Sequence, residues 1–509
     1  MAGLAKWANR KRLGTMAADR LGDYSRRFFL RGTTAASLLS ATSCRKIQNL
    51  LGLKEEHGLC LPPPNEEIDL ISHAISRLSF GPTPSDYHHV KKLGVTHREA
   101  VNAYIEEQLN PQGIDDHHAQ RAMRRFESLH APLGEMYEYK EKHLLEQLTS
   151  ATLMGAVQSK RQLYELMVHF WSDHFNIDVS KKDCKWLKAA DDREVIRKHT
   201  FGIFLDLVSA SALSPAMLWY LDGRQNRKRQ PADYPNENYA RELLELHTLG
   251  LNGGYTQKDV MEVARCLSGW TVRSKKRFFK GRVEFDPASH DDGAKVVLGH
   301  QISAGGGQKD LKDVLKILCE HPSTAQHLAE KLCVRFIADQ PSAQSIKDVA
   351  ETFMATSGDL TKVLRRVFST EEFLTGPRGG KLKKPFELIV SSLRATRAEI
   401  SSTANLIDYL VSLGHAPFQY PSPDGYPDVA APWVGGLFWR WHFAIGLARN
   451  QIHPKIRIRE AKLFQEAGGI AGFSAVLFGR KPTQEELMSF HRSGEPLAMA
   501  LASPAFQWR

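Results

Sequence analysis

Residues 166–175 read Leu-Met-Val-His-Phe-Trp-Ser-Asp-His-Phe, and this stretch decides the fold class. At about 100° per residue, the side chains at positions 163, 166, 167, 170, 171 and 174 fall on one face of a helix. Apolar residues keep this three- and four-residue spacing from position 68 through most of the chain, whereas the alternation typical of strands is almost absent. The sequence therefore predicts a mainly α fold, built as one large irregular domain of many helices.

The same periodicity gives approximate helix positions. Residues 278–300 are an exception, because valine and phenylalanine occur there in short runs around Pro287, and we expect a small β-hairpin or irregular excursion. The expected helices cover residues 67–78, 96–109, 133–153, 161–175, 192–199, 236–249, 257–268, 311–319, 323–336, 343–356, 360–367, 385–394, 433–447 and 456–466.

The composition excludes several classes of protein. The chain has 509 residues, of which 42% are hydrophobic and 25% charged, and this balance is typical of a folded protein with a large core. The formal net charge is +11, but residues 1–43 hold eight of the basic residues and only Asp19 and Asp23 as acids. The small excess that remains is scattered, so the sequence does not predict nucleic-acid binding, which needs a clustered basic face.

The N-terminal residues resemble an export signal. Residues 25–31 read Ser-Arg-Arg-Phe-Phe-Leu-Arg, close to the twin-arginine consensus, and a mildly apolar stretch follows to Ser43. That stretch is shorter than the ~20 residues that span a bilayer, and no transmembrane helix is expected elsewhere. We therefore expect a signal peptide at 1–43, a flexible linker at 44–66, a single helical domain at 67–509, and a periplasmic or envelope location. Small residues before Cys44 leave lipidation of that cysteine open.

The cysteines argue against a thiolate metal site, since none of the six forms a CxxC pair or another metal-ligand spacing. Cys266, Cys319 and Cys333 lie in apolar helical patterns, where we expect buried, inert thiols. A disulfide is allowed in an oxidising compartment, but spacing does not give its connectivity.

Two helical stretches carry candidate ligands. His174 shares the apolar face of its helix, where hydrogen-bonded packing is the commoner role and metal ligation the alternative, whereas His169 lies off that face and is expected to be exposed. In residues 236–250, Glu242 and Glu245 share a polar stripe. They are either an exposed face or a pair of carboxylates that ligate a metal or transfer protons inside a helical bundle. Ideal helical geometry places His247 about 140° from Glu242, so it joins them only if the helix unwinds.

The remaining motifs leave similar alternatives. His290 precedes Asp291 in the irregular stretch, which suits either an ordinary turn or a metal ligand with a supporting carboxylate. Trp433, Trp439 and Trp441 follow a turn at 423–427, and core packing explains them unless they form a sugar-stacking platform. The absence of GxSxG, GxxxxGK[ST] and HExxH motifs excludes the simplest hydrolase, nucleotide-binding and zincin interpretations.

Six motifs resemble the bacterial family known as domain of unknown function 1800. They are FWxxHF at 170–175, LWYLD at 218–222, NENYARELLELHTLG at 236–250, YTxxDVxxxARxLSGW at 255–270, HDxGxKxxLG at 290–299 and PDGYP at 423–427. The resemblance spans roughly residues 70 to 500. It implies a large, exported, mostly helical bacterial protein without an agreed activity, often encoded beside a second exported family, domain of unknown function 1501.

We therefore expect an exported protein with one of two functions. The first is a metal-dependent oxidoreductase or hydrolase, with a divalent transition metal of unknown identity held by His174, Glu242, Glu245, His247 and His290. The second is a non-catalytic envelope scaffold, or a partner of the co-encoded 1501-family protein or of a surface polysaccharide. The sequence assigns no catalytic residue and no residue to an organic cofactor.

Overall fold

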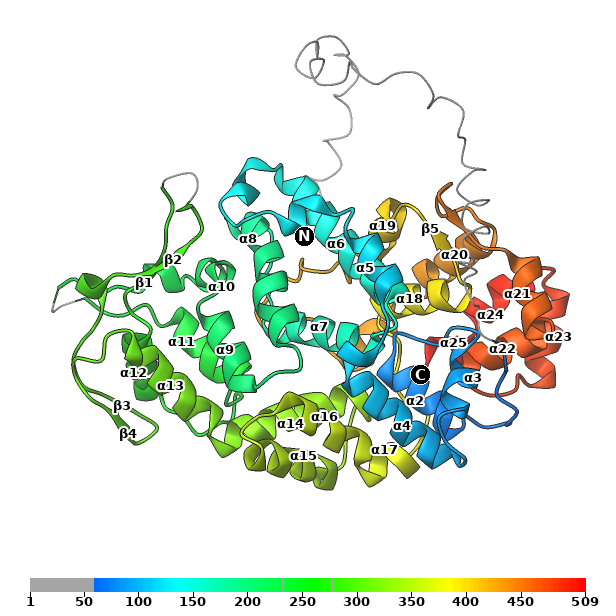
Figure 1. Ribbon diagram of the computed structural model, residues 1–509, viewed down its shortest axis with the longest axis horizontal. Helices are drawn as coiled ribbons and strands as arrows, with labels where there is room; N and C mark the ends of the chain where they lie inside the picture. Colours follow the sequence, from blue (N-terminus) through cyan, green and yellow to red (C-terminus); the bar gives the residue numbers. More distant parts are fainter. Residues whose placement is uncertain (1–58, 231–232, 276–278) are drawn as a thin grey trace, which may run out of the picture. The chain divides into compact units, whose positions relative to one another are not determined.

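The computed structural model describes residues 59–230, 233–275 and 279–509. Gly58–Arg509 forms one compact unit. The predicted signal peptide at 1–43 and residues 44–58 of the predicted linker, Cys44 among them, lie outside the described residues. The described chain is mainly α-helical with small two-stranded sheets, which confirms the predicted fold class (Figure 1).

The α-helices are α2 (Leu70–Leu78), α3 (Asp86–Lys91), α4 (His97–Leu109), α5 (His117–Met123), α6 (Glu141–Gln158), α7 (Gln162–His174), α8 (Cys184–Asp191), α9 (Phe204–Ala212), α10 (Pro215–Tyr220), α11 (Asn238–Glu242), α12 (Gln257–Cys266), α13 (Lys309–Cys319), α14 (Pro322–Phe336), α15 (Ala343–Ala355), α16 (Leu360–Ser369), α17 (Glu371–Thr375), α18 (Pro385–Ala395), α19 (Ala404–Ser412), α20 (Leu437–Ala448), α21 (Glu460–Ala467), α22 (Ile470–Phe478), α23 (Gln484–Arg492), α24 (Pro496–Ala502) and α25 (Pro504–Gln507). Two π-helical segments, η4 (Asp192–Arg197) and η6 (Leu243–His247), continue α8 and α11. The 3₁₀ helices are η1 (Pro111–Gly113), η2 (Glu127–His130), η3 (Glu135–Glu138), η5 (Gly223–Gln225), η8 (Pro287–Ser289) and η9 (Ala431–Trp433).

The strands pair locally. β1 (Trp270–Val272) pairs antiparallel with β2 (Val283–Phe285), and β3 (Lys295–Val297) pairs antiparallel with β4 (His300–Ile302), so the predicted excursion around 278–300 contains β structure. β5 (Glu399–Ile400) pairs with β6 (Ile456–Arg457). The helix predicted at 456–466 is therefore wrong at its first residues, because Ile456 lies opposite Ile400 in a sheet that local periodicity does not reveal.

Helix α7 lies at the centre of the packing. It contacts α2, α4, α6 and η4, and Figure 1 shows it among these helices. The predicted apolar face is fully buried, with Leu163, Leu166 and Trp171 at 0% exposure. The expectation that His169 is exposed is wrong, since its exposure is only 7%. An amphipathic pattern assumes one buried face, whereas a helix surrounded by neighbours buries its polar side as well.

The C-terminal helices leave aromatic side chains at the surface. Trp433 is buried, but Trp439 and Trp441 are 38% and 50% exposed. Core packing therefore explains only the first of the three, because α20 packs against α24 through its opposite face, which contains Phe443 and Leu447. None of the described helices has both the length and the apolar character that crossing a bilayer requires.

The thiols of Cys266, Cys319 and Cys333 are buried, as predicted. Burial raises the pKa of Cys266 and of Cys333 to about 12. All five cysteines in the described part of the chain are free.

Candidate functional site

Helix α7 positions two ionisable side chains one turn apart. His169 and Asp173 are four residues apart, so they lie on the same face of the helix. The distance from His169 Nδ1 to Asp173 Oδ2 is 3.6 Å, and the two side chains are only 8% and 16% exposed. Burial, reinforced by the nearby positive charge of Lys384, lowers the pKa of His169 to about 3, so the imidazole is neutral.

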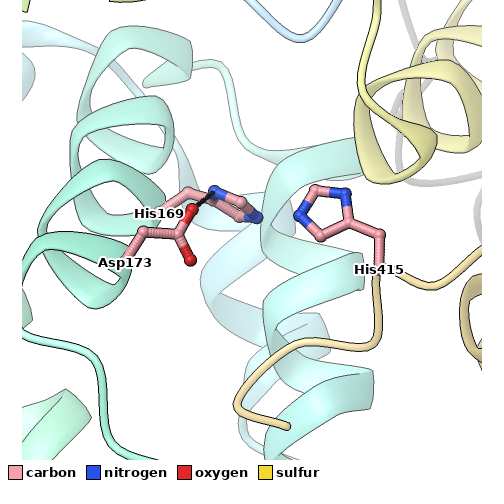
Figure 2. Close-up of side chains that lie close together, drawn as sticks. All are labelled: His169, Asp173 and His415. Atoms are coloured by element: carbon pink, nitrogen blue, oxygen red, sulfur yellow. Dashed lines mark ion pairs between the residues drawn. The ribbon is translucent and has the colours of Figure 1, made fainter. Parts of the chain in front are cut away.

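A histidine from a distant part of the sequence completes a cluster. His415, after α19, faces His169, with 5.7 Å between the ring centroids (Figure 2). One possible ligand atom from each of His169, Asp173 and His415 lies within 4.8 Å of the other two, and they are the only such group among the described residues. His169 Nδ1, Asp173 Oδ2 and His415 Nε2 are buried and have no hydrogen-bond partner in the described chain.

The contacts of His415 determine which ring nitrogen carries its proton. The backbone N–H of Phe386, at the N-terminus of α18, donates to His415 Nδ1 across 3.2 Å. Burial holds the pKa of His415 well below its usual value, so the ring carries one proton, and that proton is on Nε2. A metal ligand needs a lone pair at that position and normally donates its other N–H. His415 is therefore better suited to donate a hydrogen bond into the cluster than to bind a cation.

Buried charges give the two neighbouring aspartates different acidities. Lys384 Nζ lies 2.8 Å from Asp428 Oδ1 and 3.5 Å from Asp173 Oδ2. Burial raises the pKa of Asp173 to about 6, and Lys384 only partly opposes this shift. For Asp428 burial acts in the same direction, but Lys384 and Arg335 outweigh it and hold the pKa well below its usual range. One carboxyl can therefore hold a proton near neutral pH while the other stays ionised.

Both aspartates line a cleft of about 310 Å³. Three segments form its walls: α7, α14 and the loop that contains the Pro-Asp-Gly-Tyr-Pro motif at 423–427. The cleft is polar, with one lysine and several carboxylates. Its lining residues are Phe170, Asp173, His174, His327, Glu330, Lys331, Val334, Asp424, Tyr426, Pro427 and Asp428.

Two of the predicted ligands come together beside this cleft. His174 and His247 are at most 1% exposed, and their ring centroids are 6.0 Å apart. His174 Nε2 lies 3.2 Å from the carbonyl oxygen of His247, while His174 Nδ1 and both ring nitrogens of His247 are buried without a hydrogen-bond partner in the described chain. Burial lowers the pKa of His247 to about 3, so this ring is neutral. The π-helical segment η6 ends at His247 and departs from the ideal helical geometry that the sequence analysis assumed.

Among the described residues, neither Glu242 nor Glu245 forms a group of three possible metal ligands with His174 and His247. Glu245 accepts a 3.4 Å hydrogen bond from Arg241, its partly buried i,i+4 partner. Glu242 is half-buried, and its burial, together with the charges of Glu245 and Asp424, raises its pKa. Glu242 therefore lies near Asp424, and the role of the two glutamates as ligands stays a prediction.

His290 belongs to a separate polar network. Its Nδ1 lies 2.9 Å from the carbonyl oxygen of Ser268, and its Nε2 lies 3.1 Å from Asp310 Oδ2. Both ring nitrogens therefore have protein partners, and a metal would have to displace one of them. Asp291 pairs with Arg265 and Lys228 instead of supporting His290.

The sequence analysis missed Asp173, His415, Lys384 and Asp428 as functional candidates. The His169–Asp173 spacing was available as a signal, because residues four apart share a helix face. Asp428 directly follows the 423–427 motif. No local pattern marks His415 or Lys384, which reach the cluster only through long-range packing.

Comparison with known proteins identifies a family without assigning an activity. No curated protein and no solved structure gives a significant match to the chain. The family model described as "Protein of unknown function (DUF1800)" matches residues 73–508. The match covers nearly all of the described residues, including Asp173 and Asp428, and the chain therefore belongs to the DUF1800 family.

Proposed function

We propose that this protein is a hydrolase that uses Asp173 as a general acid in the 310 Å³ cleft. The observation that carries the proposal is that Asp173 and Asp428 line one cleft and share Lys384, while their surroundings shift the two pKa values in opposite directions. Environments that separate the pKa values of neighbouring carboxyls are a recurring feature of acid–base catalysis. A general acid also works best when its pKa lies near the working pH.

The charge of the cleft favours a neutral, hydroxyl-rich substrate. Asp173, Glu330, Asp424 and Asp428 supply hydrogen-bond acceptors and would repel a polyanion, whereas Lys331 is the one lysine in the lining. Phe170 and Tyr426 add aromatic surface, which packs well against sugar rings. Together with the export signal that the sequence predicts, these features favour a glycosidic substrate from the cell envelope.

The proposed reaction resembles glycoside hydrolysis by two carboxyl groups. Protonated Asp173 donates its proton to the leaving oxygen as the carbon–oxygen bond breaks. The ionised Asp428 stabilises the positive charge that develops on the sugar. Water supplies the new oxygen, and its released proton restores the acid form of Asp173. Lys384 and the neutral His169 keep the Asp173 carboxyl in place.

Measuring the hydrolysis of glycosidic substrates tests this proposal. We expect the protein to release reducing ends from envelope polysaccharides, or 4-nitrophenol from 4-nitrophenyl glycosides, when a panel of both is tested. The value of kcat/KM should fall as the pH rises through about 6, because Asp173 then loses its proton. Asp173→Asn should lower kcat about a hundredfold. The matched control Asp313→Asn changes an aspartate on α13 that does not line the cleft, and it should leave kcat unchanged. Turnover that Asp173→Asn leaves intact would refute the role of Asp173.

A metal-dependent enzyme is the second candidate. It is favoured by the close approach of the possible ligand atoms of His169, Asp173 and His415 and opposed by the hydrogen bond from Phe386 to His415 Nδ1. Elemental analysis of untagged protein separates the two proposals. We expect metal well below one equivalent per chain, with the same content in His415→Ala and His174→Ala. A stoichiometric metal that is lost in His415→Ala would instead assign catalysis to a metal centre.

A further inference from the structure

A group of buried cations extends from the cleft to the C-terminal residues. Each has an exposure of 6% or less, and the group consists of Arg77, Arg335, Lys381, Lys383, Lys384, Arg440 and Arg509. The acids that pair with them are Asp173, Asp339, Glu387 and Asp428. Cations therefore outnumber acids in this part of the described chain.

The ion pairs leave three cations without an acid. Arg335 pairs with Glu387 and Asp428, Lys384 with Asp173 and Asp428, Lys381 with Asp339, and Arg509 with Glu387. Among the described residues, none of the ion pairs includes Arg77, Lys383 or Arg440.

Of Arg77, Lys383 and Arg440, only Arg440 has its hydrogen-bond donors paired with neutral acceptors within the described part of the chain. Arg440 donates to Gln507 Oε1 and to the carbonyl oxygen of Lys383. Lys383 Nζ lies 3.5 Å from the centroid of the Phe506 ring, and burial, reinforced by the charge of Arg509, holds the pKa of Lys383 well below its usual value. The three guanidinium nitrogens of Arg77 have no hydrogen-bond partner in the described chain. Burying a charge without a partner is costly, so this region favours a bound anion.

A cavity of about 40 Å³ is lined by two of the buried basic residues, Lys383 and Arg509. Lys383, Arg509 and Ser72 contribute to its lining, and Arg77 lies one helical turn from His73, which also lines it. Ser72 Oγ, His73 Nε2 and Arg509 Nε are buried and unpartnered in the described chain. The volume exceeds what one water molecule needs, which is about 10–15 Å³, and suits a small ion.

We propose that this cavity binds a tetrahedral oxyanion, inorganic phosphate, through Lys383, Arg509 and Ser72. Arg509 supplies positive charge, Lys383 supplies N–H donors, and the Ser72 hydroxyl supplies a donor that has no other partner. The site is distinct from the cleft, because none of its lining residues lines the cleft.

His73 makes phosphate a better ligand than sulfate. Burial and the charges of Arg77 and Arg378 hold the pKa of His73 well below its usual value, so the imidazole is neutral. The ring hydrogen-bonds to the Phe373 backbone, and with Nε2 unpartnered, that bond uses Nδ1–H and leaves Nε2 as an acceptor. Hydrogen phosphate can donate an O–H to this acceptor, whereas sulfate has no proton to donate at neutral pH.

Equilibrium dialysis of the full chain with radiolabelled phosphate tests the proposal in HEPES buffer at pH 7. We expect one saturable equivalent per chain and weaker competition by sulfate. Lys383→Met and Ser72→Ala should each weaken binding at least about tenfold, since each removes a donor to a charged ligand. The control Lys316→Met makes the same substitution at an exposed lysine on α13, and this variant should bind phosphate like the wild type.

Three results would overturn the assignment: no saturable phosphate binding, equal affinity for phosphate and sulfate, or unchanged binding in Ser72→Ala. The serine variant stays informative even if Lys383→Met fails to fold, because Ser72 Oγ has no hydrogen-bond partner in the described chain to lose.

Discussion

Glu387→Gln should lower the free energy of unfolding by about 3–5 kcal/mol at pH 7, the loss expected when one partner of a buried ion pair is removed. Glu387 is 1% exposed and pairs with Arg335 and with Arg509. Glutamine keeps the size of the side chain but removes its charge. Arg335 would then retain only Asp428, and Arg509 would have no acidic partner among the described residues.

The pH dependence of this loss follows from the pKa of Glu387. Arg509 and Arg335 outweigh the effect of burial and hold that pKa well below 4.5. The carboxylate therefore stabilises the fold above the pKa of the unfolded chain, and this contribution is lost only as the pH falls through the lower folded pKa. Chemical denaturation from pH 5 to 8 should show a constant deficit for Glu387→Gln.

A matched control separates the buried pair from a surface pair. Glu351 pairs with Lys347 on α15, and both side chains are 65% exposed. Glu351→Gln should cost less than about 1 kcal/mol, because exposed ion pairs contribute little. Equal losses in the two variants would show that Glu387 is not the anchor of the buried network.

Asp173→Asn should have the opposite effect and stabilise the protein at neutral pH. The pKa of Asp173 rises from 3.8 in the unfolded chain to about 6 in the fold, so the folded state favours the protonated form. Ionising the group at higher pH therefore costs stability, and the wild type should lose about 2 kcal/mol between pH 4 and pH 7 from this group alone. Asparagine removes that cost.

The measurement is a pair of unfolding series across pH. Asp173→Asn should match the wild type near pH 4 and exceed it by about 2–3 kcal/mol at pH 7 and above. Asp428→Asn should destabilise the protein at pH 7, because this carboxylate is ionised between Lys384 and Arg335. If Asp173→Asn destabilised the protein at pH 7 as well, Asp173 would act as an ionised partner in the buried ion pairs. That result would contradict its role as a proton donor.

Local periodicity was enough to predict individual helices. Helix α7 runs from Gln162 to His174 where the sequence predicts 161–175, and His174 lies on the buried face as expected. The same reasoning misplaced His169 and the start of the helix at 456–466. In both places a distant segment packs against the residues and overrides the local pattern.

The candidate site was less accessible to sequence analysis than the helices. The predicted ligands His174 and His247 do meet, but His290 pairs with Asp310 in another part of the domain. The contact between Asp173 and Lys384 joins residues about two hundred positions apart. A single sequence contains no signal for such a pair, because neither residue changes the helical pattern around the other.

The sequence by itself determined the helical class, the burial of the cysteines and the resemblance to one family, because these depend on short-range spacing and on motifs. Only the tertiary structure decided which charges share a buried environment. Asp173 and Asp428 are chemically identical side chains, and the sequence assigns them the same acidity. Their pKa values separate because Lys384 and Arg335 lie close to Asp428, while burial dominates at Asp173.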